Sequence, residues 1–74
     1  MVVKLTDIQK EMIPLLVQGK TNSQIAEIVN WSVDKIKKEM KGIYQYYGIN
    51  APAGTKRAVL IREIVKTEMT RLMM

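Results

Sequence analysis

The sequence predicts an all-α domain of four helices, and three features of the chain lead to that prediction. Apolar residues recur every three or four positions, which is the spacing of one packed helix face. Residues suited to helix N-caps precede these stretches, and glycines follow some of them. No segment alternates apolar and polar residues with a strand's period of two. Residues 1–74 therefore make one domain, with helices expected at about 6–18, 21–29, 32–47 and 55–72.

The first helix has local signals at both ends. Thr6, followed three residues later by Gln9, makes a capping box, in which each side chain accepts a hydrogen bond from the other residue's backbone N–H. Gly19 can adopt the left-handed conformation that ends a helix. Pro14 removes a backbone donor inside the helix. We therefore expect a kink one turn before Pro14 or a first turn that is not fully α-helical.

The second helix is short, and a tight turn follows it. Thr21 and Gln24 form a second capping box at its start. Residues 30–32 make the turn, and Ser32 is the expected N-cap of the third helix. We expect Trp31 to fill space between the helices at this turn.

The third helix, which Gly48 ends, separates its residues into two faces. Four of the seven residues from Lys35 to Lys41 are lysines. At 100° per residue the polar face holds Asp34, Lys37, Lys38, Lys41 and Gln45. The opposite, packed face holds Ile36, Met40, Ile43 and Tyr47. Gly42 lies between the two, and a residue this small would let a neighbour approach closely.

The fourth helix follows a loop at residues 50–54, with Thr55 as its expected N-cap. It carries nine apolar residues, which is more than one buried stripe needs. The surplus predicts a second apolar face, as in a symmetric homodimer. The expected interface residues are Leu60, Ile64, Met69 and Leu72. A frayed, sticky C-terminal end is the alternative.

Composition excludes several classes of protein. The chain has no cysteine and no histidine, so it lacks thiolate metal ligands and the commonest general base. We therefore expect no enzyme, no metal and no cofactor. No stretch approaches the roughly 18 apolar residues of a membrane span, and the N-terminus has no signal-peptide run. These absences lead us to expect a cytoplasmic protein with no membrane partner.

The positive charge is confined to one part of the chain. Residues 1–31 carry three basic and three acidic residues, whereas residues 32–74 carry nine basic and four acidic ones, which accounts for the whole net charge of +5. Such asymmetry is typical of a protein that binds a polyanion, and a solubilising surface charge is the alternative. Two short helices joined by a tight turn, the second with lysines on its outer face, further indicate a helix-turn-helix motif.

The residue pattern resembles the LuxR/GerE-type DNA-binding domain. The resemblance runs without a gap from Leu5 to Ile49 and continues at Ala58 and Val59. The matching residues are Leu5, Thr6, Glu11, Leu15, Leu16, Gly19, Thr21, Asn22, Ile25, Ala26, Ser32, Ile36, Lys37, Ile43, Gly48 and Ile49. The resemblance implies a four-helix domain whose third helix reads the major groove of double-stranded DNA and whose fourth helix forms a dimer. Its base-reading positions correspond to Lys37, Lys38 and Lys41, which we call the lysine face.

Further residues are candidates for phosphate contacts. Four polar residues lie at helix N-termini, where free backbone N–H groups attract anions: Thr21, Asn22, Ser23 and Ser32. Lys35 lies at the edge of the groove-facing arc. Lys56 and Arg57 open the fourth helix, where cations oppose the helix dipole, so a phosphate contact would explain their position.

Two departures from the family pattern bear on this interpretation. Lys35 replaces the family threonine and Glu39 replaces the family histidine. We expect Glu39 to lie nearer the packed side and to pair with a lysine or Tyr46. The sequence thus predicts a sequence-specific, dimeric transcriptional regulator. The alternative is a protein-interaction module of the same fold, an adaptor or anti-activator that pairs with another transcription regulator and has lost DNA binding.

Overall fold

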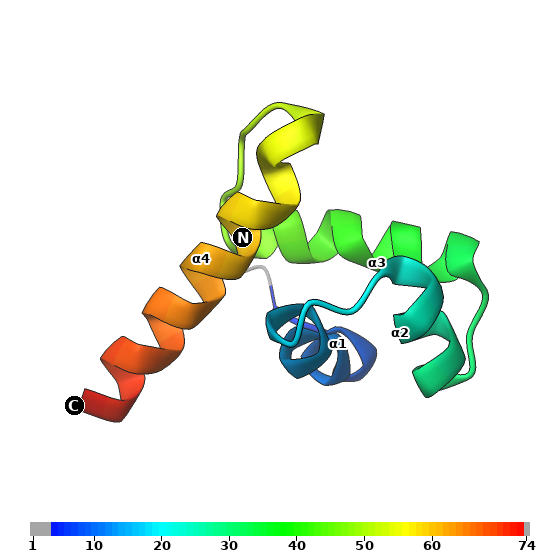
Figure 1. The fold of residues 1–74 in the computed structure, drawn as a ribbon. Coiled ribbons are helices and arrows are strands. Elements are labelled where there is room, and N and C mark those ends of the chain that lie inside the picture. The colour runs from blue at the N-terminus through cyan, green and yellow to red at the C-terminus, as the bar shows by residue number, and fades with distance from the viewer. Residues whose placement is uncertain (1–3, 74) are drawn as a thin grey trace.

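The chain folds into a bundle in which the third helix lies across the first (Figure 1). The computed structural model describes residues 4–73, and the side chains of residues 4–68. Within that range there are four α-helices and no strand, which confirms the all-α prediction: α1 (Asp7–Val17), α2 (Asn22–Val29), α3 (Val33–Tyr46) and α4 (Ala53–Met73). α2 lies beside the start of α3, whereas α4 follows the other end of α3 and its last turns point away from the other helices (Figure 1).

Local hydrogen bonds begin the first three helices as predicted. In the first capping box the Thr6 N–H donates to Gln9 Oε1 over 2.8 Å, and the Gln9 N–H donates to Thr6 Oγ1 over 3.3 Å. The second capping box joins Thr21 and Gln24 in the same way, with distances of 2.9 and 3.1 Å. At the third N-cap, Ser32 Oγ accepts a hydrogen bond of 3.2 Å from the Lys35 N–H.

The starts of α1 and α4 differ from expectation. α1 is α-helical from Asp7 onward and includes Pro14, so the expectation of a first turn that is not fully α-helical is wrong, because the capping box holds that turn in helical geometry. The other alternative, a kink one turn before Pro14, stays a prediction. α4 begins at Ala53, two residues before the expected N-cap Thr55. The Thr55 N–H and hydroxyl both donate to the Pro52 carbonyl, over 3.0 and 3.2 Å, so Thr55 lies inside the first turn and does not precede it.

Trp31 lies outside the core, so the expectation that it fills space between helices is wrong. Asn30 ends α2 in the left-handed conformation, with φ of 61°, and the chain then turns into α3. The Trp31 side chain keeps 38% of its surface exposed. Its ring instead lies beside the Lys35 ammonium, and the buried apolar residues of α2 are Ile25 and Ala26.

The core is small and receives residues from all four helices. Its buried apolar members are Met12, Leu16, Ile25, Ala26, Ile36, Met40, Ile43, Leu60 and Ile64. Three of the four residues assigned to the packed face of α3 belong to it, and the fourth, Tyr47, is half-buried against it. The two faces of α3 are therefore those that the helical periodicity predicts.

The inward face of α4 corrects part of the predicted dimer interface. Leu60 and Ile64 have no exposed surface in the single chain, so their assignment to an interface between two chains is wrong. They pack against the core that the other three helices form. Met69 and Leu72 lie outside the described side chains. No helix in the described part of the chain is long and apolar enough to cross a bilayer.

Candidate nucleic-acid interface

The lysine face is exposed along one side of α3. Lys37, Lys38 and Lys41 are all exposed, together with Asp34 and Gln45 on the same arc. α3 has 14 residues and is therefore about 21 Å long. An α-helix with its side chains is about 10–12 Å across, so it fits the major groove of B-DNA, which is about 12 Å wide. The structure thus brings the three predicted base-reading residues together on a helix whose opposite face is buried.

Lys35 differs from these three lysines because its ammonium group has two partners. Its Nζ lies 5.1 Å from the centre of the Trp31 ring and 3.9 Å from Glu39 Oε2. The Lys35 side chain is 51% exposed, whereas the Glu39 side chain is only 16% exposed. The expectation that Glu39 lies nearer the packed side and pairs with a lysine is confirmed. Lys35 is therefore held at the α2–α3 turn, at the edge of the lysine face.

Gln9 is a residue of this region that sequence reasoning missed. Its side chain is 6% exposed, and its Nε2 donates to Glu39 twice: to Oε1 over 3.2 Å and to the main-chain carbonyl over 3.3 Å. The capping box by itself accounts for a glutamine at position 9, so the sequence around Gln9 does not indicate a second role. The one sequence feature that points to this contact is Gly42 inside α3, since a Cβ at Gly42 would lie 2.2 Å from Gln9 Nε2.

The start of α2 is held by a residue from the start of α4. Arg57 Nη1 donates to Asn22 Oδ1 over 2.9 Å, and Arg57 Nη2 donates to the Lys20 carbonyl. Asn22 and Arg57, both predicted phosphate contacts, are thus hydrogen-bonded to each other. Arg57 has five N–H donors in all, so it keeps capacity for another acceptor. Ser23, which follows Asn22 in the sequence, is exposed.

A second lysine is positioned by an aromatic ring near the start of α4. Lys56 Nζ lies 4.5 Å from the centre of the Tyr44 ring. Burial raises the pKa of the Tyr44 hydroxyl above its ordinary value of 10.0, although the nearby Arg57 opposes that change. Tyr44 is therefore a neutral phenol at physiological pH, and its ring can hold the Lys56 cation by a cation–π contact.

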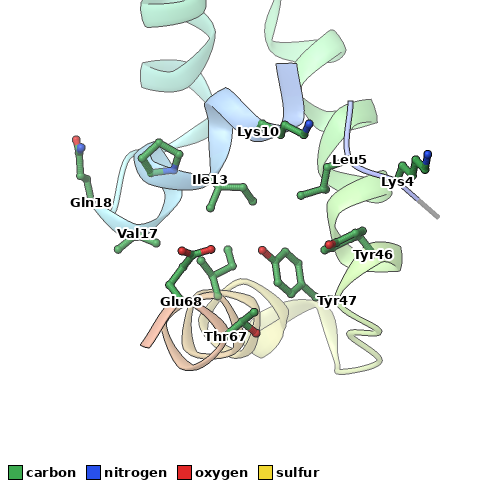
Figure 2. A pocket seen from close by; sticks show the side chains of 12 residues that line it. Lys4, Leu5, Lys10, Ile13, Val17, Gln18, Tyr46, Tyr47, Thr67 and Glu68 are labelled. Atoms are coloured by element: carbon green, nitrogen blue, oxygen red, sulfur yellow. The ribbon is translucent and has the colours of Figure 1, made fainter. Parts of the chain in front are cut away.

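A separate groove of about 860 Å³ lies between α1 and α4, next to the end of α3. Figure 2 shows Ile13 and Val17 of α1 facing Thr67 and Glu68 of α4, with the Tyr47 ring beside them. The charged residues at its rim are Lys4, Lys10 and Glu68. No residue of the lysine face lines this groove, so a molecule bound there would leave the lysine face accessible.

Comparisons of the chain with protein-family models, with curated proteins and with solved structures gave no match. A functional interpretation of this chain therefore depends on its own residues and their geometry.

Proposed function

We propose that this chain is a sequence-specific DNA-binding transcriptional regulator of the LuxR/GerE type, which acts as a dimer in the cytoplasm with α3 in the major groove. One observation carries the proposal: Lys37, Lys38 and Lys41 are exposed together on α3, directly opposite its buried face. α2 and the tight turn at the start of α3 complete the arrangement of a helix-turn-helix.

The chemistry of the lysine face suits base edges in the major groove. A lysine ammonium can donate to the O6 and N7 acceptors of guanine, although it discriminates less than a bidentate arginine. The candidate phosphate contacts lie at helix starts: Ser32 at the start of α3, Thr21, Asn22 and Ser23 at the start of α2, and Lys56 and Arg57 in the first turns of α4. In this proposal these residues contact phosphates and set the register of α3 on the DNA.

The lysine face is tested by Lys37→Ala and Lys41→Ala. Each substitution should weaken binding to a DNA site, selected from a random library with the purified protein, by roughly 1–3 kcal/mol. The fold should survive because both side chains are exposed. Lys10→Ala is the matched control, since it removes the same charge from α1 outside the lysine face. Equal losses of affinity in all three variants would show that Lys37 and Lys41 contribute only general electrostatic attraction to DNA.

The proposed dimer uses the outward side of α4. Leu60 and Ile64 face the core, whereas Val65 is 39% exposed and Ile61 is half-buried. Ile61 and Val65 are four residues apart and therefore lie on one side of the helix. We propose this side, continued by Met69 and Leu72 in the sequence, as the contact between two copies.

The α1–α4 groove favours a second candidate function. Its apolar lining, which includes Leu5, Ile13, Val17 and Tyr47, could hold an apolar side chain of another protein. The chain would then be an adaptor or anti-activator that pairs with another transcription regulator. Mobility-shift assays with random-sequence DNA at low and high salt, beside sedimentation, discriminate between the two functions. Absence of any shift at low salt would favour the interaction module, because phosphate contacts supply most non-specific affinity.

A further inference from the structure

Glu39 joins two polar contacts that lead in opposite directions. On its buried side, Oε1 accepts a hydrogen bond of 3.2 Å from Gln9 Nε2. On its exposed side, Oε2 lies 3.9 Å from Lys35 Nζ. Lys35 in turn lies beside the Trp31 ring at the α2–α3 turn. A continuous series of polar contacts therefore runs from the first turn of α1 to the edge of the lysine face.

The inner end of this series has little freedom to move. Gln9 is 6% exposed, and its Oε1 is fixed by the Thr6 N–H at 2.8 Å. Its Nε2 makes both hydrogen bonds to Glu39. The amide lies where a side chain at position 42 would begin, since a Cβ on Gly42 would be 2.2 Å from Gln9 Nε2. Glu39 is thus held by α1 through its Oε1 and its main-chain carbonyl, and its other carboxylate oxygen, Oε2, pairs with Lys35.

We propose that Glu39 is a positioning residue which, anchored by Gln9, holds the Lys35 ammonium against Trp31 so that Lys35 meets one DNA phosphate at a defined place. The inference rests on the proposed DNA-binding function. It assigns to Lys35 a role different from that of the three residues of the lysine face. Lys37, Lys38 and Lys41 are exposed on one arc of α3, and in the proposed function they contact base edges. Lys35 is prepositioned, and a phosphate contact at a fixed place sets the register in which the other three lysines reach the bases.

The contact between Gln9 and Glu39 can be broken without losing the capping box. Gln9→Glu keeps an oxygen that accepts from the Thr6 N–H but places its other oxygen against Glu39, where two carboxylates repel each other. Gln24→Glu is the matched control, because Gln24 has the same role in the second capping box and is exposed. We expect Gln9→Glu to melt roughly 5 °C or more below Gln24→Glu.

Exchanging the two side chains separates the anchoring of Glu39 from the positioning of Lys35. In the double variant Gln9→Glu with Glu39→Gln, the amide at position 39 donates to the carboxylate at position 9, so most of the melting temperature should return. Lys35 then has no carboxylate at position 39. The double variant should therefore keep the lower ratio of selected to random DNA affinity that Glu39→Gln shows alone, although its stability is restored. Recovery of wild-type DNA selectivity in the double variant would overturn the positioning role.

Glu39→Gln is the direct test on DNA. Loss of the carboxylate should raise affinity for random-sequence DNA about threefold to tenfold, since a negative charge near phosphates is removed. Affinity for the selected site should rise less, because Lys35 is no longer held in place. The ratio of selected to random affinity therefore falls. Glu11→Gln removes an exposed carboxylate from α1, outside the lysine face, and should leave that ratio unchanged. An unchanged ratio in Glu39→Gln would overturn the proposal.

Trp31, the chain's one tryptophan, reports on Lys35 in the absence of DNA. An ammonium beside the indole attracts iodide, so Lys35→Met should reduce iodide quenching of Trp31 fluorescence, whereas Lys38→Met should not. Equal quenching in both variants would show that Lys35 is not held at Trp31 and would overturn the inference. If the wild-type protein binds no random DNA at low salt, the proposed function fails and the phosphate contact fails with it, whatever the quenching shows.

Discussion

At the scale of single residues, Gly42 shows how a missing side chain supports the candidate interface. Glycine inside a helix costs about 1 kcal/mol relative to alanine. At this position the absence of a Cβ lets the Gln9 amide lie against α3, where it makes both hydrogen bonds to Glu39. Each such bond contributes roughly 0.5–1.5 kcal/mol, and more when the acceptor is charged. The close approach of Gln9 therefore outweighs the propensity that glycine loses.

Gly42→Ala should consequently lower the free energy of unfolding, by about 1 kcal/mol, although alanine is the better helix former. The new Cβ would lie 2.2 Å from Gln9 Nε2 and displace the amide. Gly54→Ala in α4 is the control, because its added Cβ would meet no other part of the structure within 4 Å, and it should be neutral or mildly stabilising. Urea unfolding measures both variants.

The sign of the effect depends on Gln9. In a Gln9→Ala background the amide is gone, so Gly42→Ala should raise the free energy of unfolding and reveal the propensity gain alone. If Gly42→Ala stabilised the wild-type chain by the same amount as the Gln9→Ala chain, the two positions would not be coupled and the close contact would have no energetic weight.

At the scale of elements, α4 divides between two roles. Its inward residues Leu60 and Ile64 complete the core, whereas Val65 is exposed on the outward side. Arg57, near its start, bonds to Asn22 and to the Lys20 carbonyl and so connects α4 with the start of α2. α4 thus packs on the other helices with one side, whereas its other side is the proposed contact with a second copy.

Two substitutions in α4 should separate these roles. Leu60→Ala should lower the free energy of unfolding by roughly 2–5 kcal/mol, because it leaves a cavity in a fully packed site. Val65→Asp should leave the melting temperature of the monomer nearly unchanged but shift sedimentation from dimer to monomer, since it places a charge in the proposed apolar contact. A variant Val65→Asp that still sediments as a dimer would contradict the contact on the outward side of α4.

At the scale of the whole molecule, stability depends on a core that holds nine buried apolar residues among the side chains that the structure describes. A domain this small buries a modest fraction of its surface, so peripheral contacts matter more than in a large protein. Tyr44 is one of these contacts: it packs against the core, its ring lies under Lys56, and Arg57 lies near its hydroxyl. Ionisation of Tyr44 would place a charge in this half-buried position.

The stability of the domain should therefore decline in alkali. Burial raises the pKa of Tyr44 in the folded chain above 10.0, so the unfolded chain releases this proton first as the pH rises. The contribution of Tyr44 is complete below pH 10 and is lost as the pH passes through the higher pKa of the folded state. Tyr44→Phe should lose less stability above pH 10 than Tyr46→Phe, which keeps Tyr44; thermal unfolding between pH 8 and 11 measures this. Parallel curves would show that Tyr44 does not titrate differently in the two states.

The sequence by itself determined the starts of the first three helices and the two faces of α3. Thr6 with Gln9, Thr21 with Gln24, and Ser32 act on backbone groups three residues away, so no distant partner is needed. The exposure of the lysine face likewise follows from helical periodicity once the opposite stripe is apolar. For these features, local geometry is sufficient.

Only the tertiary structure decided which apolar stripe of α4 is buried, because several stripes are available and the choice depends on the shape of the core that α1, α2 and α3 leave. The same holds for the contacts that join residues far apart: Gln9 and Glu39 are separated by 30 positions, and Asn22 and Arg57 by 35. Hydrogen bonds over such separations depend on how the helices pack, and no periodicity within one helix encodes them. The lysine face is thus a property of one helix, whereas the position of Lys35 at its edge depends on α1 as well.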